Sequence, residues 1–186
     1  MKRVYQDMVL NGFKGTRPDK VIKQLGITKG ALYHYFPSKE ALGYAVIEEI
    51  LQPSIVSNWE PLKSFPENPV DFLLGGINIM KETLTKKSIS LGSPLSKLIQ
   101  EMAPLDDGFR RRLHKIVDEI HKIVSDALKQ GQRKGQVKKH IDADKIAYFI
   151  LSCLEGSYIH AKVSKSKDIF NNNLECLSEY LKLLKA

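Results

Sequence analysis

Apolar residues along this chain recur at helical spacing, and no stretch of useful length alternates as a strand would. Residues 70–84 carry apolar side chains at i, i+3, i+4, i+7, i+10 and i+14: Val70, Leu73, Leu74, Ile77, Met80 and Leu84. Residues 109–128 carry a longer stripe, formed by Phe109, Leu113, Ile116, Val117, Ile120, Ile123, Val124 and Leu128. Such stripes are typical of amphipathic helices that cover a core with one face. The pattern therefore predicts an all-α fold.

Two more helices are predicted near the C-terminus. The one that Asp142 caps is apolar almost all round between residues 146 and 159, and the last runs from about Phe170 to Leu184. A helix that is apolar on both sides has to be covered on both sides. In a chain of 186 residues we expect a second copy of the chain to provide the second cover.

The first 51 residues are predicted to form shorter helices separated by turns. Gly12 ends a first helix, and Gly26 forms the tight turn between a short second helix and a third one that Thr28 caps. Ser38 caps a fourth helix. The apolar residues expected to hold the second and third helices together are Val21, Ile22, Leu25, Ile27, Leu32 and Phe36. A helix-turn-helix of this kind inserts its second helix into the DNA major groove, with the N-terminal residues of that helix at the base edges.

A proline-rich stretch separates this head from the remaining chain. It contains Pro53, Pro61, Pro66 and Pro69. Prolines at such a density mark a loop and a transition between domains. We therefore predict a helix-turn-helix DNA-binding domain over residues 1–51 and a helical ligand-binding and dimerisation domain over residues 52–186.

The positive charge of the chain is concentrated at its start. The formal net charge is +8, and residues 1–39 hold eight basic against two acidic side chains, so that +6 of it lies in this segment. A basic head on a nearly balanced body favours phosphate binding over a general role in solubility. Without the helix-turn-helix, a solvated lysine-rich face would be the ordinary interpretation.

Other kinds of chemistry find little support in the sequence. No serine-nucleophile elbow, dinucleotide-binding glycine motif or phosphate-binding loop occurs, so we expect no catalytic residue and no cofactor. His114, Asp118 and His121 fall on one helical face, but on a long amphipathic helix they are more typical of solvent-facing or pocket-lining residues, and no metal is expected. Cys153 and Cys176 are expected to be buried, reduced thiols. Since no signal or membrane-spanning segment is recognised, we expect a cytoplasmic protein without a membrane partner.

Residues 26–42 resemble the DNA-binding signature of the TetR family of bacterial repressors. The match is Gly-Ile-Thr-Lys-Gly-Ala-Leu-Tyr-His-Tyr-Phe-Pro-Ser-Lys-Glu-Ala-Leu, without a gap. The resemblance implies a double-stranded DNA operator as partner, and it places Tyr35 and Phe36 in the core of the head. Family members usually carry a longer first helix preceded by a basic arm, which either lies upstream of Met1 or is missing here. The DNA-binding residues that follow from the resemblance and the helix starts are Arg17, Thr28, Lys29, Gly30, Tyr33, His34 and Lys39.

The body resembles a TetR subgroup that includes electrophile- and acrylate-responsive repressors. The similarity lies in Gly92-Ser93-Pro94-Leu95 followed by Glu101, in residues 109–113 and in residues 158–166. In many members of that subgroup a cysteine that senses reactive compounds follows the first glycine, whereas this chain has Ser93. We therefore expect a small-molecule inducer that binds reversibly and without a covalent bond, in a pocket lined mainly by apolar side chains. The lining residues we expect are Met80, Met102, Leu113, Val117, His121 and Tyr158.

The family pairs through its last two long helices, which implies a homodimer held by a four-helix bundle. The contacts expected in this chain are Phe149, Gly156, Leu174, Leu177 and Leu181. These expectations describe a ligand-responsive transcriptional regulator, a repressor that a small molecule releases from a palindromic operator. The alternative is a small-molecule-binding or enzymatic helical protein with a vestigial DNA-binding head, which predicts weak, salt-insensitive DNA binding. A helical adaptor would need exposed apolar surface beyond one dimer interface.

Overall fold

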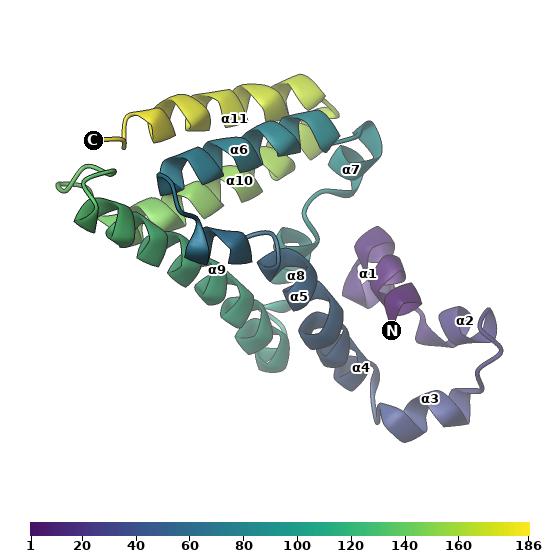
Figure 1. Cartoon of the computed structure of the whole chain (residues 1–186). Helices are drawn as coiled ribbons and strands as arrows, with labels where there is room; N and C mark the ends of the chain where they lie inside the picture. Colours follow the sequence, from purple (N-terminus) through teal and green to yellow (C-terminus); the bar gives the residue numbers. More distant parts are fainter. The chain divides into compact units, whose positions relative to one another are not determined.

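The computed structural model describes the whole chain, residues 1–186, and confirms the all-α fold, with no strand (Figure 1). The α-helices are α1 (Lys2–Gly15), α2 (Pro18–Lys23), α3 (Lys29–Tyr35), α4 (Lys39–Val46), α5 (Gln52–Val56), α6 (Pro69–Thr83), α7 (Lys86–Leu91), α8 (Pro94–Met102), α9 (Asp107–Arg133), α10 (Ala143–Ser164) and α11 (Lys167–Lys182). A π-helical turn (Ile47–Leu51) joins α4 to α5, and a 3₁₀ turn (Glu60–Ser64) precedes α6. None of these helices has both the length and the apolar character needed to span a membrane.

The chain forms two compact units. The N-terminal unit contains Met1–Val56 and Pro94–Ile116, and the C-terminal unit contains Ser57–Ser93 and Val117–Ala186. The sequence predicts a first domain over residues 1–51, whereas the structure adds residues 52–56 and 94–116 to this unit. The physical reason is an aromatic contact, since the ring of Phe109 on α9 lies 4.4 Å from that of Phe13 and 5.0 Å from that of Tyr44.

The core of the N-terminal unit is closely packed around Gly43 on α4. A Cβ at this position would lie 2.6 Å from a ring carbon of Phe13 and 2.7 Å from one of Phe109. Because no side chain fits in that space, glycine lets α4 approach both rings. Phe109 is fully buried as a result.

Asp106 links the start of α9 to α4 within the N-terminal unit. Its Oδ1 accepts a hydrogen bond of 2.8 Å from the backbone N–H of Phe109, and the hydroxyl of Tyr44 donates to both of its oxygens at 2.8 and 2.9 Å. The hydrogen bond from Phe109 and that from Tyr44 hold the pKa of the Asp106 carboxyl below its usual value. The ionised form therefore stabilises the unit.

We expect Asp106→Ala to destabilise the protein by about 1 kcal/mol at neutral pH, because α9 loses its N-terminal cap and Tyr44 its acceptor. A carboxyl with a depressed pKa contributes stability above its unfolded pKa and loses it as the pH falls through the folded pKa. Urea unfolding at pH 7 and at about pH 2–4 checks this. The difference in the free energy of unfolding between wild type and variant should disappear in acid. A difference in the free energy of unfolding that stays constant with pH would contradict a stabilising role of the ionised Asp106 carboxyl.

The C-terminal unit is built around α6, α10 and α11, which lie side by side (Figure 1). α11 packs against both α10 and α6. Asp142 caps α10 by accepting hydrogen bonds from the backbone N–H groups of Asp144 and Lys145, both at 3.1 Å. This cap is the one that the sequence predicts.

Three leucines of α11 that the sequence assigns to the dimer contact lie inside the C-terminal unit. The exposed fractions of Leu174, Leu177 and Leu181 are 0%, 3% and 0%. The prediction is wrong for these side chains, because the apolar stripe of α11 is covered by α6 and α10 of the same chain. The structure leaves Phe149 and Gly156 of the same prediction at the surface, and Phe149 is 44% exposed.

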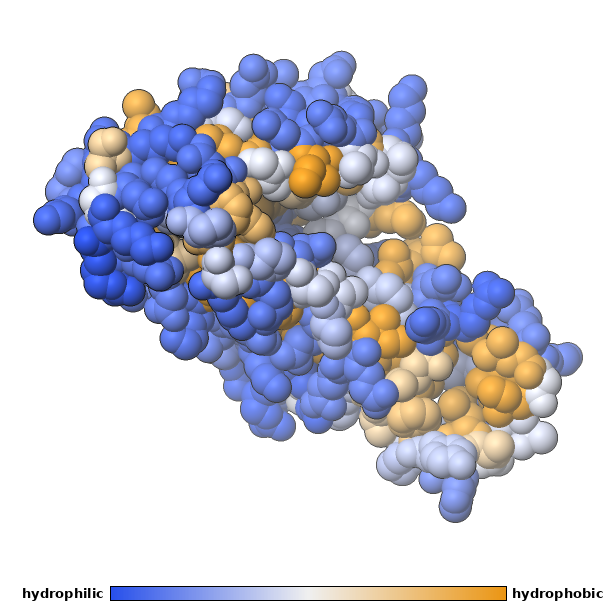
Figure 2. Space-filling model, in the orientation of Figure 1, coloured by the Kyte–Doolittle hydropathy of each residue, from blue (hydrophilic) through white to orange (hydrophobic).

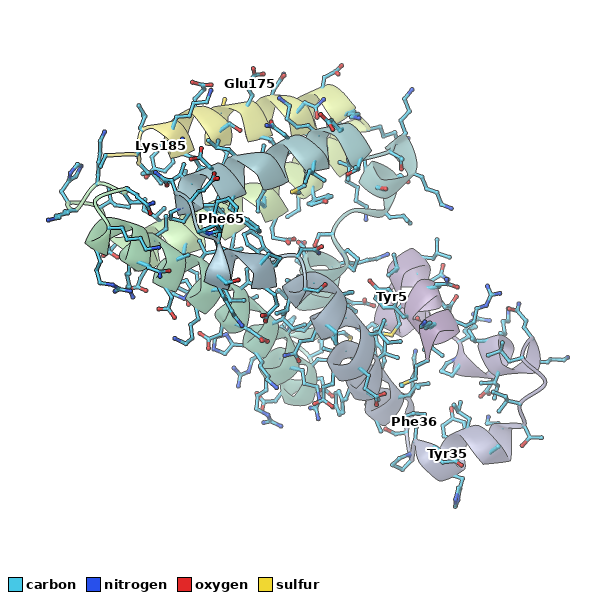
Figure 3. All side chains as sticks on the ribbon, in the orientation of Figure 1. Tyr5, Tyr35, Phe36, Phe65, Glu175 and Lys185 are labelled. Atoms are coloured by element: carbon cyan, nitrogen blue, oxygen red, sulfur yellow. The ribbon has the colours of Figure 1, made fainter.

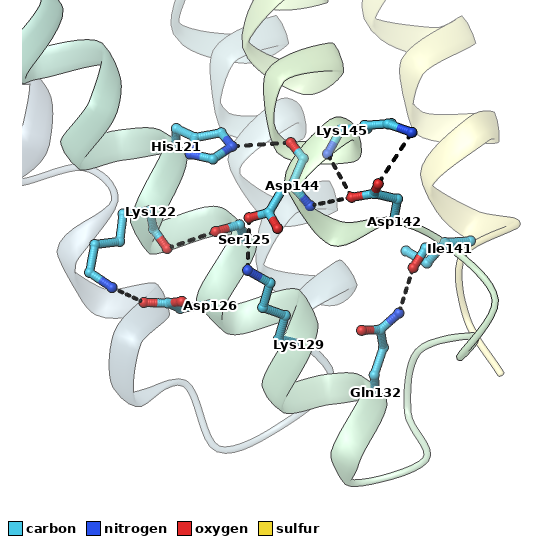
Figure 4. Close-up of polar contacts among 10 residues, drawn as sticks. All are labelled: His121, Lys122, Ser125, Asp126, Lys129, Gln132, Ile141, Asp142, Asp144 and Lys145. Atoms are coloured by element: carbon cyan, nitrogen blue, oxygen red, sulfur yellow. Dashed lines mark hydrogen bonds and ion pairs between the residues drawn. The ribbon is translucent and has the colours of Figure 1, made fainter.

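Polar contacts tie the second half of α9 to the start of α10 (Figure 4). Lys129 forms an ion pair of 2.8 Å with Asp144, and the Nε2 of His121 lies 3.1 Å from the carbonyl oxygen of the same residue. His121 also stacks on Tyr148, with ring centroids 3.9 Å apart. These contacts give His121 a structural partner on α10.

Candidate nucleic-acid interface

The short helix α3 presents nearly all of its length to solvent. Thr28 caps it as predicted, because its hydroxyl accepts a hydrogen bond of 3.2 Å from the backbone N–H of Ala31. Thr28, Lys29, Gly30 and His34 are exposed, and Tyr33 is half-buried. A Cβ at Gly30 would meet nothing within 4 Å, so the backbone here is open to close approach by another molecule.

Lys29 is held in place by an acidic neighbour on α2. Its ammonium lies 2.8 Å from a carboxylate oxygen of Asp19 and 5.6 Å from the ring centroid of Tyr33. The hydrogen bond and charge of Asp19 raise the pKa of Lys29, so this side chain is a cation at neutral pH. The two side chains are 68% and 51% exposed, and an ion pair so open to water breaks at little cost when a phosphate offers an alternative.

Lys39, at the start of α4, is held by α1. Its ammonium donates a hydrogen bond of 3.0 Å to the carbonyl oxygen of Lys14 and lies 4.8 Å from the ring centroid of Phe13. Ser38 caps α4, accepting a hydrogen bond of 3.0 Å from the backbone N–H of Ala41. Lys39 is therefore positioned by its surroundings before any DNA is present.

Arg17 lies at the turn between α1 and α2. Its backbone N–H donates a hydrogen bond of 3.1 Å to a carboxylate oxygen of Asp7, which fixes the turn, and its side chain is exposed. Arg17, the predicted residues at the start of and along α3, and Lys39 all belong to the N-terminal unit. This unit therefore contains every predicted DNA-binding residue.

Some apolar residues of the helix-turn-helix are more exposed than the sequence predicts. Leu25 and Ile27 are 47% and 45% exposed, and Tyr35 is 78% exposed at the surface of α3 (Figure 3). The prediction that Tyr35 belongs to the core is wrong, because α3 has no buried residue and the ring of Tyr35 packs only edge-on against His34. Apolar side chains accordingly gather on the surface over α1–α3 (Figure 2).

The six residues predicted to line a ligand pocket divide between the units. Met102 and Leu113 are 5% and 1% exposed in the N-terminal unit, while the other four belong to the C-terminal unit. Among these, Tyr158 packs against Phe170 at 4.9 Å between ring centroids. Burial, followed by the charge of Glu155, raises the pKa of Tyr158, so that it is a neutral phenol. Met80, Val117 and His121 are partly exposed.

The cysteines differ from their predicted burial. Cys176 is exposed and Cys153 is only partly buried. Partial burial raises the pKa of the Cys153 thiol, which lowers its thiolate fraction and its reactivity. The expectation that both thiols are buried is therefore wrong for Cys176, because this residue lies on the outward side of α11.

Two family models match this chain. The family model described as "Bacterial regulatory proteins, tetR family" matches residues 8–46, and the one described as "Tetracyclin repressor-like, C-terminal domain" matches residues 72–176. The HTH-type transcriptional repressor DhaR of Mycobacterium sp. (strain GP1) is 27% identical over 173 residues, which cover 91% of this chain and 84% of that protein. The HTH-type transcriptional repressor NemR of Escherichia coli (strain K12) is 26% identical over 163 residues, 88% of this chain and 82% of that protein.

Solved structures show the same fold. The crystal structure of the reduced form of E. coli NemR superposes with a TM-score of 0.85 at 24% sequence identity, covering 100% of this chain and 94% of that one. A TetR transcriptional regulator from Chloroflexus aurantiacus superposes with a TM-score of 0.84 at 18% identity, covering 98% and 92%. At these identities the superpositions establish the arrangement of the helices.

Proposed function

The chain belongs to the TetR family of bacterial regulatory proteins, and from this premise we propose that it is a homodimeric repressor that leaves a palindromic operator when a small molecule binds its C-terminal unit. It is a DNA-binding transcriptional regulator and not an enzyme. The observation that carries the proposal is the exposed face of α3, where a capped helix start and Lys29, Tyr33 and His34 are available to another molecule. Since the proposed target is operator DNA, the proposal places the protein in the bacterial cytoplasm.

Each residue of this face has a proposed role. Lys29 reaches a guanine edge or a phosphate, and Gly30 lets the backbone of α3 come close to the groove. The polar ends of Tyr33 and His34 bind phosphate oxygens, as does the ammonium of Lys39. Arg17, at the start of α2, adds a further basic contact. Phosphate contacts set the position of the helix on the duplex, while base contacts supply the sequence preference.

We expect Lys29→Ala to weaken operator binding and to reduce the slope of log affinity against log salt by about one, if Lys29 meets a phosphate. If Lys29 meets a base instead, discrimination at one base pair falls by about 1–3 kcal/mol. Asp19→Asn should act in the opposite direction, because it frees the ammonium from its 2.8 Å ion pair. Fluorescence anisotropy with labelled operator at several salt concentrations measures both.

Lys63→Ala is the matched control, since Lys63 is also an exposed lysine in an ion pair, at 2.7 Å from Glu60, but lies in the C-terminal unit. Its affinity and salt slope should equal those of the wild type. Affinity that is weak and independent of salt in the wild type would favour the alternative of a vestigial head. Equal binding by wild type and Lys29→Ala would remove Lys29 from the interface.

The proposed dimer uses the outward side of the last two helices. One row of residues recurs every seven positions along α10: Phe149, Gly156 and Val163. A second row with the same spacing lies on α11 and the residue that follows it: Ile169, Cys176 and Leu183. Phe149, Val163, Ile169 and Leu183 are 44%, 78%, 37% and 65% exposed. A seven-residue spacing keeps a row of side chains on one side of a helix, which suits packing against a second helix pair. A twofold dimer presents two heads, and this symmetry requires an operator with two matching half-sites.

The proposed inducer is a partly apolar small molecule that binds reversibly. Methionine at position 80 tolerates ligands of varied shape, and the neutral phenol of Tyr158 offers one hydrogen-bonding group. An inducer shifts the equilibrium between the DNA-binding and the released conformations only because it binds the two with different affinities. Selection of bound DNA from a random pool, repeated with candidate inducers, identifies both the operator and the inducer class. Release that requires Cys153 or Cys176 would contradict the non-covalent proposal.

A further inference from the structure

Helix α1 contains a break, and α8 carries the two charged side chains that satisfy it. Gly12 has φ 75° and ψ 172°, so the helical hydrogen bonding is interrupted there. On one side of the break the ammonium of Lys97 donates hydrogen bonds of 2.8 and 3.0 Å to the carbonyl oxygens of Val9 and Leu10. On the other side the carboxylate of Glu101 accepts hydrogen bonds of 2.8 Å each from the backbone N–H groups of Phe13 and Lys14.

The signs of these charges suit the two helix ends that they meet. The carbonyls at the end of a helical segment attract a cation, and the N–H groups at the start of the next attract an anion. Hydrogen bonds to an ionised partner are also stronger than those between neutral groups. Lys97 and Glu101 therefore hold the break in one conformation. All of these residues belong to the N-terminal unit.

The break is directly connected to Lys39. The ammonium of Lys39 is bound by the carbonyl oxygen of Lys14 and lies over the ring of Phe13. These are the same two residues whose backbone N–H groups Glu101 fixes. Glu101 is partly buried, and neither a hydrogen bond nor an ion pair joins it to Lys39. Its effect on Lys39 therefore passes through residues 13 and 14.

We propose that Glu101 is a positioning residue for operator binding, which sets the place of the Lys39 ammonium through the backbone of Phe13 and Lys14, with Lys97 supporting the other side of the break. The inference rests on the proposed role of Lys39 as a phosphate contact. It gives a function to a residue that lies outside the helix-turn-helix, 62 positions along the chain from Lys39.

The sign of the effect separates this role from simple electrostatics. Glu101 places a negative charge on the unit that binds a polyanion. Removing that charge would by itself tighten DNA binding, because the local potential becomes more positive. The positioning role predicts the reverse for Glu101→Gln, since the amide that replaces the carboxylate has one oxygen and cannot accept from both N–H groups in the same way.

The experiment compares Glu101→Gln, Lys39→Gln and the double variant, with the operator selected by the wild-type protein from a random pool. We expect Glu101→Gln to bind about tenfold more weakly, which corresponds to the loss of one charged hydrogen bond. Lys39→Gln should lower the salt slope by about one. The double variant should bind no more weakly than Lys39→Gln alone, because Glu101 acts through Lys39. Glu49→Gln, which removes an exposed carboxylate of the same unit, is the matched control and should bind as tightly as the wild type or more tightly.

Unchanged or tighter binding by Glu101→Gln would overturn the inference, and so would additive losses in the double variant. Far-UV circular dichroism and thermal unfolding establish that each variant is folded. If Glu101→Gln does not fold, Lys97→Gln takes its place, with the same expected weakening and the same lack of additivity with Lys39→Gln. If Lys39→Gln binds like the wild type while Lys29→Ala binds weakly, this inference fails and the proposed function stands. Failure of the wild-type protein to select any operator from the random pool would overturn the proposed function itself.

Discussion

Replacement of Leu177 by Glu is expected to unfold the C-terminal unit, and a loss of dimerisation would follow only from that unfolding. Leu177 is 3% exposed on the side of α11 that packs against α6 and α10. A carboxylate placed there has no partner and is moved out of water, which is among the few changes that cost more than about 4 kcal/mol. A domain of this size has a stability of about 5–15 kcal/mol, so a cost of this size removes a large part of it.

Thermal and urea unfolding, followed by far-UV circular dichroism, measure this change. Ile79→Glu is the matched control, since Ile79 is 60% exposed on α6, which carries none of the proposed dimer contacts, and its replacement should shift the free energy of unfolding by about 0.5 kcal/mol or less. A folded Leu177→Glu variant with the unfolding midpoint of the wild type would contradict the packing of α11 against α6 and α10.

The features that the sequence predicts well are those decided by neighbouring residues. Thr28, Ser38 and Asp142 are predicted as helix caps, and in the structure each accepts a hydrogen bond from the first turn of its helix. A cap needs only a short polar side chain and the start of a helix. The helical stripes follow from the same kind of local rule, which is why the all-α fold could be predicted without a structure.

The features that the sequence does not reveal depend on residues far apart in the chain. The stripe of Leu174, Leu177 and Leu181 shows that one side of the last helix is covered, but spacing alone cannot show whether the cover comes from the same chain or from a second copy. In the sequence Glu101 is noticeable only as part of the segment that resembles the TetR subgroup. Its hydrogen-bond partner, the backbone N–H of Phe13, lies 88 positions away. Such a contact has no signature in local spacing.

The helix-turn-helix shows the same division. The position of α3 and its exposed basic and aromatic residues agree with the sequence, because the turn at Gly26, with φ 68°, and the cap at Thr28 are local. The apolar character of Leu25 and Ile27 predicts their burial, and the resemblance implies that of Tyr35. Leu25 and Ile27, however, lie in the turn between α2 and α3. Because helices of six and seven residues offer few positions that reach a common core, these two side chains and that of Tyr35 stay exposed.

Ile159→Glu is expected to produce a folded monomer that has lost most of its affinity for a two-half-site operator. Ile159 is 45% exposed on the outward side of α10, between Gly156 and Val163 of the proposed dimer surface. A glutamate there remains in water in the monomer, so the free energy of unfolding of the isolated chain changes by about 0.5 kcal/mol or less. In the dimer the same charge would be buried at the interface without a partner, which disfavours association by several kcal/mol.

The loss of DNA affinity follows from the loss of the link between two heads. A dimer binds its second half-site as an intramolecular step, which raises the overall affinity by about 10²–10⁴-fold over that of one head, and a monomer has no such gain. Light scattering measures the mass, and anisotropy measures the affinity for an operator with one or two half-sites. Ile79→Glu is the matched control, because Ile79 is 60% exposed on α6, which carries none of the proposed dimer contacts, and this variant should remain dimeric. Binding to a single half-site should be equal in all three proteins, and a dimeric Ile159→Glu variant that binds the full operator with wild-type affinity would show that the subunits pair through another surface.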